Sequence, residues 1–312
     1  MYRALFLDTR SLIRFERPSW AKESFSYSLM VYYTPEFAAA TDNIEEFIDK
    51  MIEETNQGYS NSKLPITVTK FCSELATISE HCVNPGSLLD TFTKMKGSHS
   101  TGFFSFISYF YSFIILFLEE LEYKFRWEES YSALRNTADA ATLLVLNQNH
   151  SSCGEGFFAA YRTKKSFSWV KKNCAFRSGM WSLGHELGHN LGAAHNARDS
   201  GTSLPRGHGY FIKKGKYQIG LRSIMAYPRK GYEIRTNYYS NPDVIHPLTG
   251  TPTGDWKSNN AAIIRMNIGK LAAIGDESGS CKRSFNWRDP LQPWRKMAAK
   301  LSAATGICLM VS

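Results

Sequence analysis

Short apolar runs occur along the first half of the chain and predict buried β-strands. They occupy residues 27–33 (YSLMVYY), 64–71 (LPITVTKF) and 139–146 (DAATLLVL), and the third is apolar enough to be covered on both faces. The text after Thr41 differs, because its apolar residues recur at spacings of three and four: Ile44, Phe47, Ile48, Met51 and Ile52. This spacing, which follows cap-type residues, predicts one amphipathic helix. Two more short strands are predicted at 156–161 and 166–170.

One segment departs from these patterns. Residues 103–118 (FFSFISYFYSFIILFL) carry no charge, and three glutamates follow within four positions. A helix that spans a bilayer needs about 20 apolar residues, so this run is marginal for crossing a membrane. We expect a buried or surface-packed helix inside an insertion at about 97–128. A membrane contact and a segment foreign to the functional protein are the alternatives.

Residues 179–196 (GMWSLGHELGHNLGAAHN) contain the pattern H-E-x-x-H-x-x-G-x-x-H. Residues four apart share one face of a helix, so His185 and His189 can direct their imidazoles at one point. Gly192 can adopt a positive φ, which lets the chain leave the helix and bring His195 to the same point. Three histidine nitrogens bind zinc well and leave a coordination position for water, so the pattern predicts one catalytic Zn²⁺.

Glu186 follows the first histidine of this pattern. Its carboxylate is placed to accept a proton from water at the metal, which is the role of a general base. Three unrelated histidines that fall at these positions by chance are the alternative. Five specified residues at fixed offsets, in a chain with only 8 histidines, argue against it.

On this motif the sequence resembles the metzincin metallopeptidases, in which a methionine-containing turn follows the long zinc motif. The candidate turn is 223–227 (SIMAY). The resemblance implies that Met225 forms a hydrophobic floor under the histidines and that Tyr227 points to the metal, where its hydroxyl can donate to the transition-state oxyanion. A packed aromatic is the alternative for Tyr227.

The resemblance extends from about residue 27 to 273 and looks most like the reprolysin-like branch that includes bacterial peptidyl-aspartate metalloendopeptidases. The supporting text is VYYTPEF, ADAATLLVL, CGEGFFAAY, GHGY and NYYSNPDVIHPLTGTPTG, in this order. Asn196 is a departure, because snake-venom-type reprolysins usually carry Asp after the third histidine. This departure weakens assignment to that subgroup and leaves the metal ligands unaffected.

The resemblance implies an α/β fold: a metzincin-type twisted mixed sheet with helices, the zinc-site helix at the cleft, and a smaller irregular C-terminal subdomain that contains the Met turn. The catalytic domain would occupy 26–275, between a leader of unclear role (1–25) and a basic tail (276–312). Gly156 and Phe157 would belong to the sheet-edge strand on which an extended substrate pairs. Cys153 and Cys174 flank the two short strands, where the family has a hairpin-like excursion, and we expect them to pair.

Charge and cysteine content limit the classes of binding partner and indicate the cellular location of the protein. The formal charge of +9 favours acidic partners in general. No phosphate loop, Cys2His2 finger or basic run with interleaved aromatics supports a nucleic-acid partner. Six cysteines without a C-x-x-C pair favour disulfides and a secreted or extracellular location. The N-terminal text lacks the apolar stretch of a signal peptide, so export follows another route or the N-terminus is incomplete.

Eight basic residues and one acidic residue lie between positions 206 and 235. In metzincins the chain after the Met turn lines the pocket for the residue that follows the cleaved bond. Arg229 or Arg235 would then pair with an acidic substrate side chain there. A solvated basic surface is the alternative.

These features predict a monomeric zinc metalloendopeptidase that cleaves protein or peptide substrates without a covalent intermediate, with an acidic residue preferred after the scissile bond. A non-catalytic zinc-binding protein and a membrane-associated metzincin-like protein are the alternatives. The intact Glu186 disfavours the first of them, since zinc binding alone does not need that carboxylate.

Overall fold

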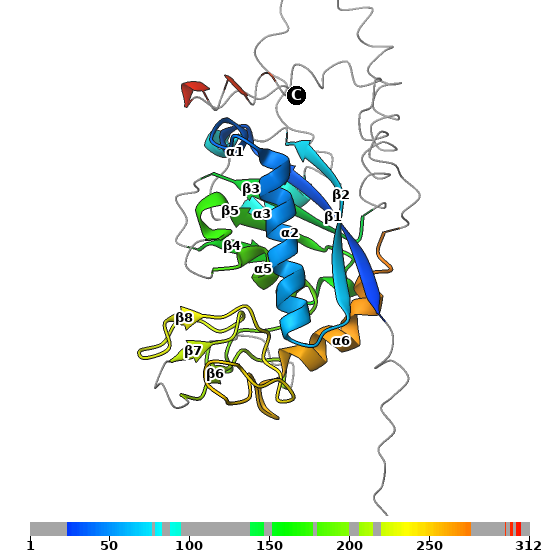
Figure 1. Ribbon diagram of the computed structural model, residues 1–312. Coiled ribbons are helices and arrows are strands. Elements are labelled where there is room, and N and C mark those ends of the chain that lie inside the picture. Colours follow the sequence, from blue (N-terminus) through cyan, green and yellow to red (C-terminus); the bar gives the residue numbers. More distant parts are fainter. Residues whose placement is uncertain are drawn as a thin grey trace, which may run out of the picture.

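The computed structural model describes residues 24–76, 79–82, 88–94, 138–146, 152–176, 180–199, 206–214 and 220–275, with 297, 300, 301 and 304–306 near the C-terminus (Figure 1). The expected insertion at 97–128, its apolar run 103–118 and most of the leader and tail lie outside these residues. Within the described ranges, no helix has both the length and the apolar character that crossing a bilayer requires.

Five strands form one mixed sheet in the order β2-β1-β3-β5-β4. The strands are β1 (Phe25–Tyr33), β2 (Ile66–Leu75), β3 (Ala140–Val145), β4 (Gly154–Gly156) and β5 (Phe167–Lys171). All neighbours are parallel except β4, which pairs antiparallel with β5 at one edge. The strands predicted at 27–33, 64–71, 139–146 and 166–170 are therefore present, and the predicted mixed α/β sheet is confirmed.

Side chains of the central strands alternate between two apolar layers, as the two-residue repeat of a strand requires. On one face Leu29 and Leu144 pack in a cluster with residues of the helices α2 (Ile44–Asn61), α5 (Ser182–Asn190) and α6 (Asn260–Leu271). On the other face Leu143 and Trp169 pack with residues of α3 (Leu88–Lys94). All six residues of β3 are buried, which confirms that this strand is covered on both faces. The remaining helical segments are α1 (Pro35–Ala39) and the 3₁₀ turns η2 (Glu80–Cys82), η4 (Ala160–Arg162) and η5 (Lys172–Cys174).

Helix α2 is the amphipathic helix predicted after Thr41. Asn43 caps its N-terminus by accepting a hydrogen bond from the Glu46 amide at 3.2 Å. Its buried face includes Ile48, Met51 and Ile52. The helix packs on the sheet and against α5, and Figure 1 shows it lying along the sheet.

Three short strands form a second, smaller sheet in the C-terminal half: β6 (Phe211–Ile212), β7 (Leu221–Arg222) and β8 (Ile234–Arg235). Figure 1 shows this sheet beneath α5. The hydroxyl of Tyr239 donates to the Gly184 carbonyl of α5 at 2.6 Å, and its ring stacks on Tyr59 of α2 with centroids 5.4 Å apart. Tyr239 therefore fixes the irregular C-terminal part against both helices.

The strand predicted at 156–161 is wrong over most of its length. Strand β4 ends at Gly156, and the chain turns into η4 at Ala160. Ala159 adopts the left-handed conformation (φ 52°), and its amide donates to the His189 carbonyl at 2.8 Å. This contact with the end of α5 bends the chain away from the sheet, a tertiary effect that local apolar content does not reveal.

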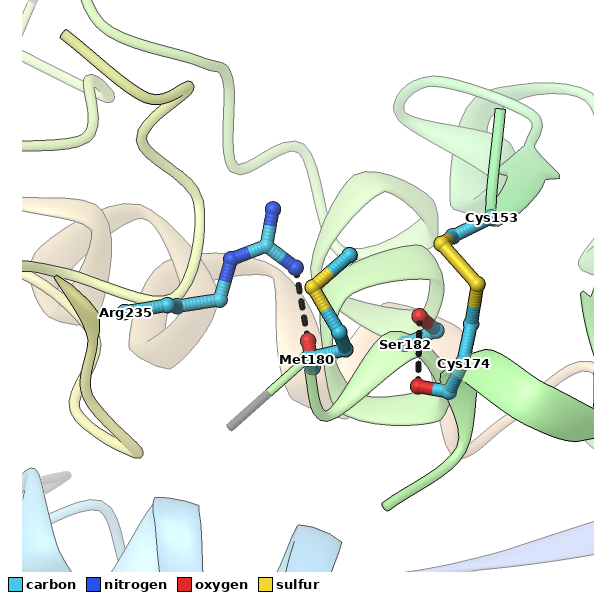
Figure 2. The surroundings of a disulfide bond; sticks show 5 residues. All are labelled: Cys153, Cys174, Met180, Ser182 and Arg235. Atoms are coloured by element: carbon cyan, nitrogen blue, oxygen red, sulfur yellow. Dashed lines mark hydrogen bonds between the residues drawn. A yellow bond between two sulfur atoms is a disulfide. The ribbon is translucent and has the colours of Figure 1, made fainter. Parts of the chain in front are cut away.

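Cys153 and Cys174 form a disulfide, which confirms the predicted pair; their Cα atoms are 5.5 Å apart (Figure 2). Cys153 directly precedes β4, and Cys174 ends η5. The Cys174 carbonyl accepts a hydrogen bond from the Ser182 hydroxyl at 3.2 Å, at the first turn of α5. The disulfide therefore joins the edge of the sheet to the segment that leads into α5.

Replacing Cys153 and Cys174 together with serine should lower the free energy of unfolding by about 3 kcal/mol, because the closed loop restricts the unfolded chain. Urea unfolding of the two proteins, both loaded with metal, measures this difference. The double variant leaves the disulfide of Cys72 intact, whereas reduction with a thiol would break that bond as well. An unchanged unfolding midpoint would contradict the stabilising role.

Candidate metal centre and active site

Helix α5 carries two histidines whose rings meet that of a third. The Nε2 atom of His195 lies 3.1 Å from Nε2 of His185 and 3.0 Å from Nε2 of His189. Across the described ranges, this is the one group of three or more His, Cys, Asp or Glu side chains close enough to hold a metal ion. The predicted metal-binding triad is therefore confirmed.

A tight turn after α5 brings His195 to the other two rings. The helix ends at Asn190, and Gly192 has a φ of 89°, a left-handed conformation that glycine adopts at no steric cost. Its amide donates to the His189 carbonyl at 2.8 Å, and the next amide, that of Ala193, donates to Gly188 at 2.9 Å. These bonds satisfy carbonyls at the helix end and reverse the chain toward the metal site.

Backbone carbonyls set the orientation of the first two rings. Nδ1 of His185 donates to the Ile224 carbonyl at 2.8 Å, and Nδ1 of His189 donates to the Ala193 carbonyl at 2.9 Å. Because a carbonyl only accepts, Nδ1 carries the hydrogen and Nε2 keeps its lone pair in each ring. The unprotonated nitrogens therefore face the shared point.

All three rings are neutral at pH 7. Burial is the largest cause that lowers their pKa values, to about 4 for His189, to about 3 for His195 and well below the ordinary value for His185. Neutral imidazoles are the form that binds zinc. Three lone pairs directed at one point favour a cation there, so the residues fit one Zn²⁺.

Glu186 is buried beside β4, where a missing side chain makes room for its carboxylate. A Cβ atom added at Gly154 would lie 2.8 Å from Oε1 of Glu186. Burial raises the pKa of Glu186 to about 8; the charge of Arg235 opposes the rise and that of Glu155 adds to it. The role of Gly154 was not predicted, although the alternating glycines of CGEG are a signal in the sequence.

Met225 is fully buried under the zinc helix. A Cβ atom added at Gly188 would lie 2.7 Å from its sulfur, so the glycine between the two helical histidines permits this close packing. Arg222 stabilises the Met turn, because its guanidinium donates to the carbonyls of Ala226 and Glu233 at 2.5 and 3.3 Å. The roles of Gly188 and Arg222 were also missed, because both depend on contacts between distant segments.

Tyr227 lies over the third histidine. Its ring centroid is 3.8 Å from that of His195, and the side chain is 42% exposed. Its amide donates to Oδ1 of Asn196 at 3.0 Å. Asn196, the residue that departs from the venom-type pattern, thus ties the Met turn to the segment of His195.

At the outer edge of β4, the backbone groups of two glycines make no hydrogen bond to another described residue. Cys153 and Phe157 bond to β5 through their backbones, at 2.9 and 3.2 Å. In an antiparallel ladder such positions alternate, so the N–H and C=O groups of Gly154 and Gly156 point away from β5. The carbonyl of Phe157 accepts from Asn190 at 2.9 Å, so the backbone of Phe157 is engaged within the protein.

The two arginines proposed from the basic interval have different environments. Arg229 is exposed, and its guanidinium lies 5.3 Å from the ring centroid of Phe211. Arg235 is buried and donates to the Met180 carbonyl at 2.6 Å, just before α5 (Figure 2). Only Arg235 is therefore held against the zinc helix.

Comparison with known proteins gives the family. Residues 24–240 match the model of Metallo-peptidase family M12. The chain is 28% identical over 215 residues to a peptidyl-Asp metalloendopeptidase of Stenotrophomonas maltophilia, covering 68% of this chain and 43% of the relative. It is 26% identical over 235 residues to a protein of the same name from Xanthomonas campestris pv. campestris, covering 74% and 47%. The chain thus spans less than half the length of these relatives.

A solved structure described as that of a chaperone-substrate complex is similar in fold. It matches with a TM-score of 0.50 and 16% identity, over 81% of this chain and 39% of that one. At this identity the likeness concerns the fold alone. The family match covers most of the chain and includes the three histidines and the Met turn. The chain therefore belongs to metallo-peptidase family M12, the reprolysin-like family that the zinc motif predicts.

Proposed function

We propose that this chain is a zinc-dependent endopeptidase that hydrolyses internal peptide bonds of proteins or peptides and prefers an acidic residue after the scissile bond. The observation that carries the proposal is the convergence of three neutral histidine nitrogens, with a buried glutamate next to them in the sequence. Membership of family M12 supports the same activity.

Each side chain around the metal has a separate role in hydrolysis. Zinc, when bound, lowers the pKa of water toward neutrality and polarises the substrate carbonyl. Glu186 accepts the proton of the attacking water and donates it to the leaving amine. The Tyr227 hydroxyl donates to the oxyanion as it forms. Met225 and Gly192 keep the ligands in place, and the free edge at Gly156 pairs with the extended peptide, which favours internal bonds.

The acidic preference is supported by chemistry and by relatives. Two of the similar proteins carry the name peptidyl-Asp metalloendopeptidase. The segment after the Met turn contains three basic residues between 228 and 235 and one acidic residue, Glu233. A guanidinium binds a carboxylate through two parallel hydrogen bonds, which makes Arg229 and Arg235 the candidates for that contact.

We also propose where the protein acts, where its catalytic domain begins and ends, and that it is a monomer. The Cys153–Cys174 disulfide fits an oxidising compartment, and we propose that the protein acts outside the cell. We place the catalytic domain at 26–275 and propose that it works as a monomer. A non-catalytic zinc-binding protein is the competing function, and loss of activity on metal removal distinguishes the two.

Removal of the metal should abolish peptide hydrolysis, and added zinc should restore it, because the three histidines supply the ligands. The measurement is cleavage of a denatured protein substrate before chelation, after chelation and after zinc addition, with metal content determined at each step. Single variants His185→Ala, His189→Ala and His195→Ala should each lower zinc occupancy. Zinc that binds fully without any hydrolysis would favour the non-catalytic function.

The Glu186→Ala variant should retain one zinc per chain and lose roughly 10²- to 10⁴-fold in rate, because a general base is removed and no ligand is lost. Glu53→Ala is the matched control, since Glu53 is an exposed glutamate of helix α2. Zinc content and initial rates are measured for both proteins. Loss of zinc from a folded Glu186→Ala protein would mean that Glu186 is a ligand.

The Tyr227→Phe variant should keep its zinc and its KM but lose roughly 10²- to 10³-fold in kcat, the usual cost of removing an oxyanion donor. Tyr232→Phe serves as control, because Tyr232 lies in the same segment and contacts Phe211 at 5.3 Å between centroids. Steady-state kinetics of the three proteins decide the point. A kcat equal to that of the unmodified protein would assign Tyr227 a packing role alone.

A further inference from the structure

Arg235 is a buried cation whose hydrogen-bonding capacity is largely unused. The residue is only 8% exposed, and its Nη1 atom donates to the Met180 carbonyl. Its Nε atom is buried and has no hydrogen-bond partner among the described residues. Buried charges in proteins are normally paired, because an unpaired charge loses its hydration without compensation.

A second buried arginine lies beside the first. Arg222 of β7 and Arg235 of β8 are register partners in the small parallel sheet, and Arg222 is 4% exposed. The guanidinium of Arg222 is occupied by the carbonyls of Ala226 and Glu233. Within the described ranges, neither arginine forms a salt bridge with a carboxylate. Two adjacent cations therefore generate a positive potential without a salt bridge to any carboxylate of these ranges.

The unpaired charge lies next to the metal centre. The register partner of Arg235, Arg222, lies two residues before Ile224, and the Ile224 carbonyl orients the His185 ring at 2.8 Å. Met180, the one hydrogen-bond partner of Arg235 among the described residues, lies two residues before the first residue of α5. These contacts place Arg235 beside the two segments that carry and orient the metal ligands.

We propose that Arg235 is the specificity-determining residue of the site and binds the carboxylate of the acidic substrate residue that follows the scissile bond. Nε and Nη2 form the side of a guanidinium that can donate two parallel hydrogen bonds to one carboxylate. Figure 2 shows these nitrogens turned away from the Met180 carbonyl, which holds Nη1. This inference rests on the proposed endopeptidase function and adds the residue that selects the substrate.

Two other arginines of the interval, Arg222 and Arg229, have different roles. Arg222 keeps the Met turn and the start of β8 in place, so it positions Arg235 and adds positive charge behind it. Arg229 is exposed and lies on the ring of Phe211, so water competes for any carboxylate that it meets. Of these three, Arg235 alone is desolvated and also keeps a buried guanidinium nitrogen, Nε, without a hydrogen-bond partner among the described residues.

The test uses two peptides that differ only in Asp or Asn after the scissile bond, because the two side chains have nearly the same shape and differ in charge. The ratio of kcat/KM for the two peptides is measured for the full chain loaded with zinc, and mass spectrometry identifies the cleaved bond. We expect a ratio of about 30 or more, the factor typical of a buried charge pair. The ratio should fall to near 1 in Arg235→Met.

Three further variants complete the set. Arg235→Lys should give an intermediate ratio, because lysine keeps the charge and loses the paired donors. Lys230→Met removes an exposed charge of the same segment and should keep the full ratio. Arg229→Met should also keep it. Zinc content and circular dichroism verify that each variant is folded.

Binding of the same peptides to zinc-loaded Glu186→Ala protein, with and without Arg235→Met, tests the inference separately from catalysis. Tighter binding of the Asp peptide that disappears with Arg235→Met supports the inference even if hydrolysis is not observed, in which case the proposed function fails alone. An Asp preference that survives in Arg235→Met and disappears in Arg229→Met overturns it. Equal binding and equal cleavage of the two peptides by the unmodified site overturn it as well.

Discussion

Neutral imidazoles whose lone pairs face one another repel, so the arrangement of His185, His189 and His195 depends on restraints outside the rings. Helical spacing aligns the first two, and the left-handed Gly192 returns the third. The carbonyls of Ile224 and Ala193 fix the ring orientations through Nδ1. Each restraint costs little free energy by itself, and together they prepare the site so that a cation does not have to reorganise it.

The same restraints explain why the C-terminal subdomain lies where it does. Ile224 orients a metal ligand, Met225 fills the space that Gly188 leaves, and Tyr239 donates to the Gly184 carbonyl of the zinc helix. The Met turn and Tyr239 therefore join the C-terminal subdomain to α5 at three residues of the helix. Because β7 and β8 are carried along with that segment, Arg222 and Arg235 lie close to the metal site.

The sequence predicts the parts of this protein that local periodicity and fixed spacing determine. Four strands of the main sheet, helix α2 and the histidine triad all follow from such patterns, and the Cys153–Cys174 pair follows from the family resemblance. The edge strand is shorter than predicted because a contact between Ala159 and His189 turns the chain. The partners of His185 and Arg235 could not be predicted, because both are backbone carbonyls, which every residue type possesses.

The parallel sheet links segments that lie far apart along the chain. Asp139 accepts hydrogen bonds from the amide and the hydroxyl of Ser28, 111 positions earlier, whereas the metal ligands span only ten. Pairing over such a sequence separation raises the contact order, which slows folding in general, whereas the ligand segment closes over a short stretch of chain. The metal site therefore combines a locally closed ligand segment with a sheet whose strands come from distant parts of the sequence.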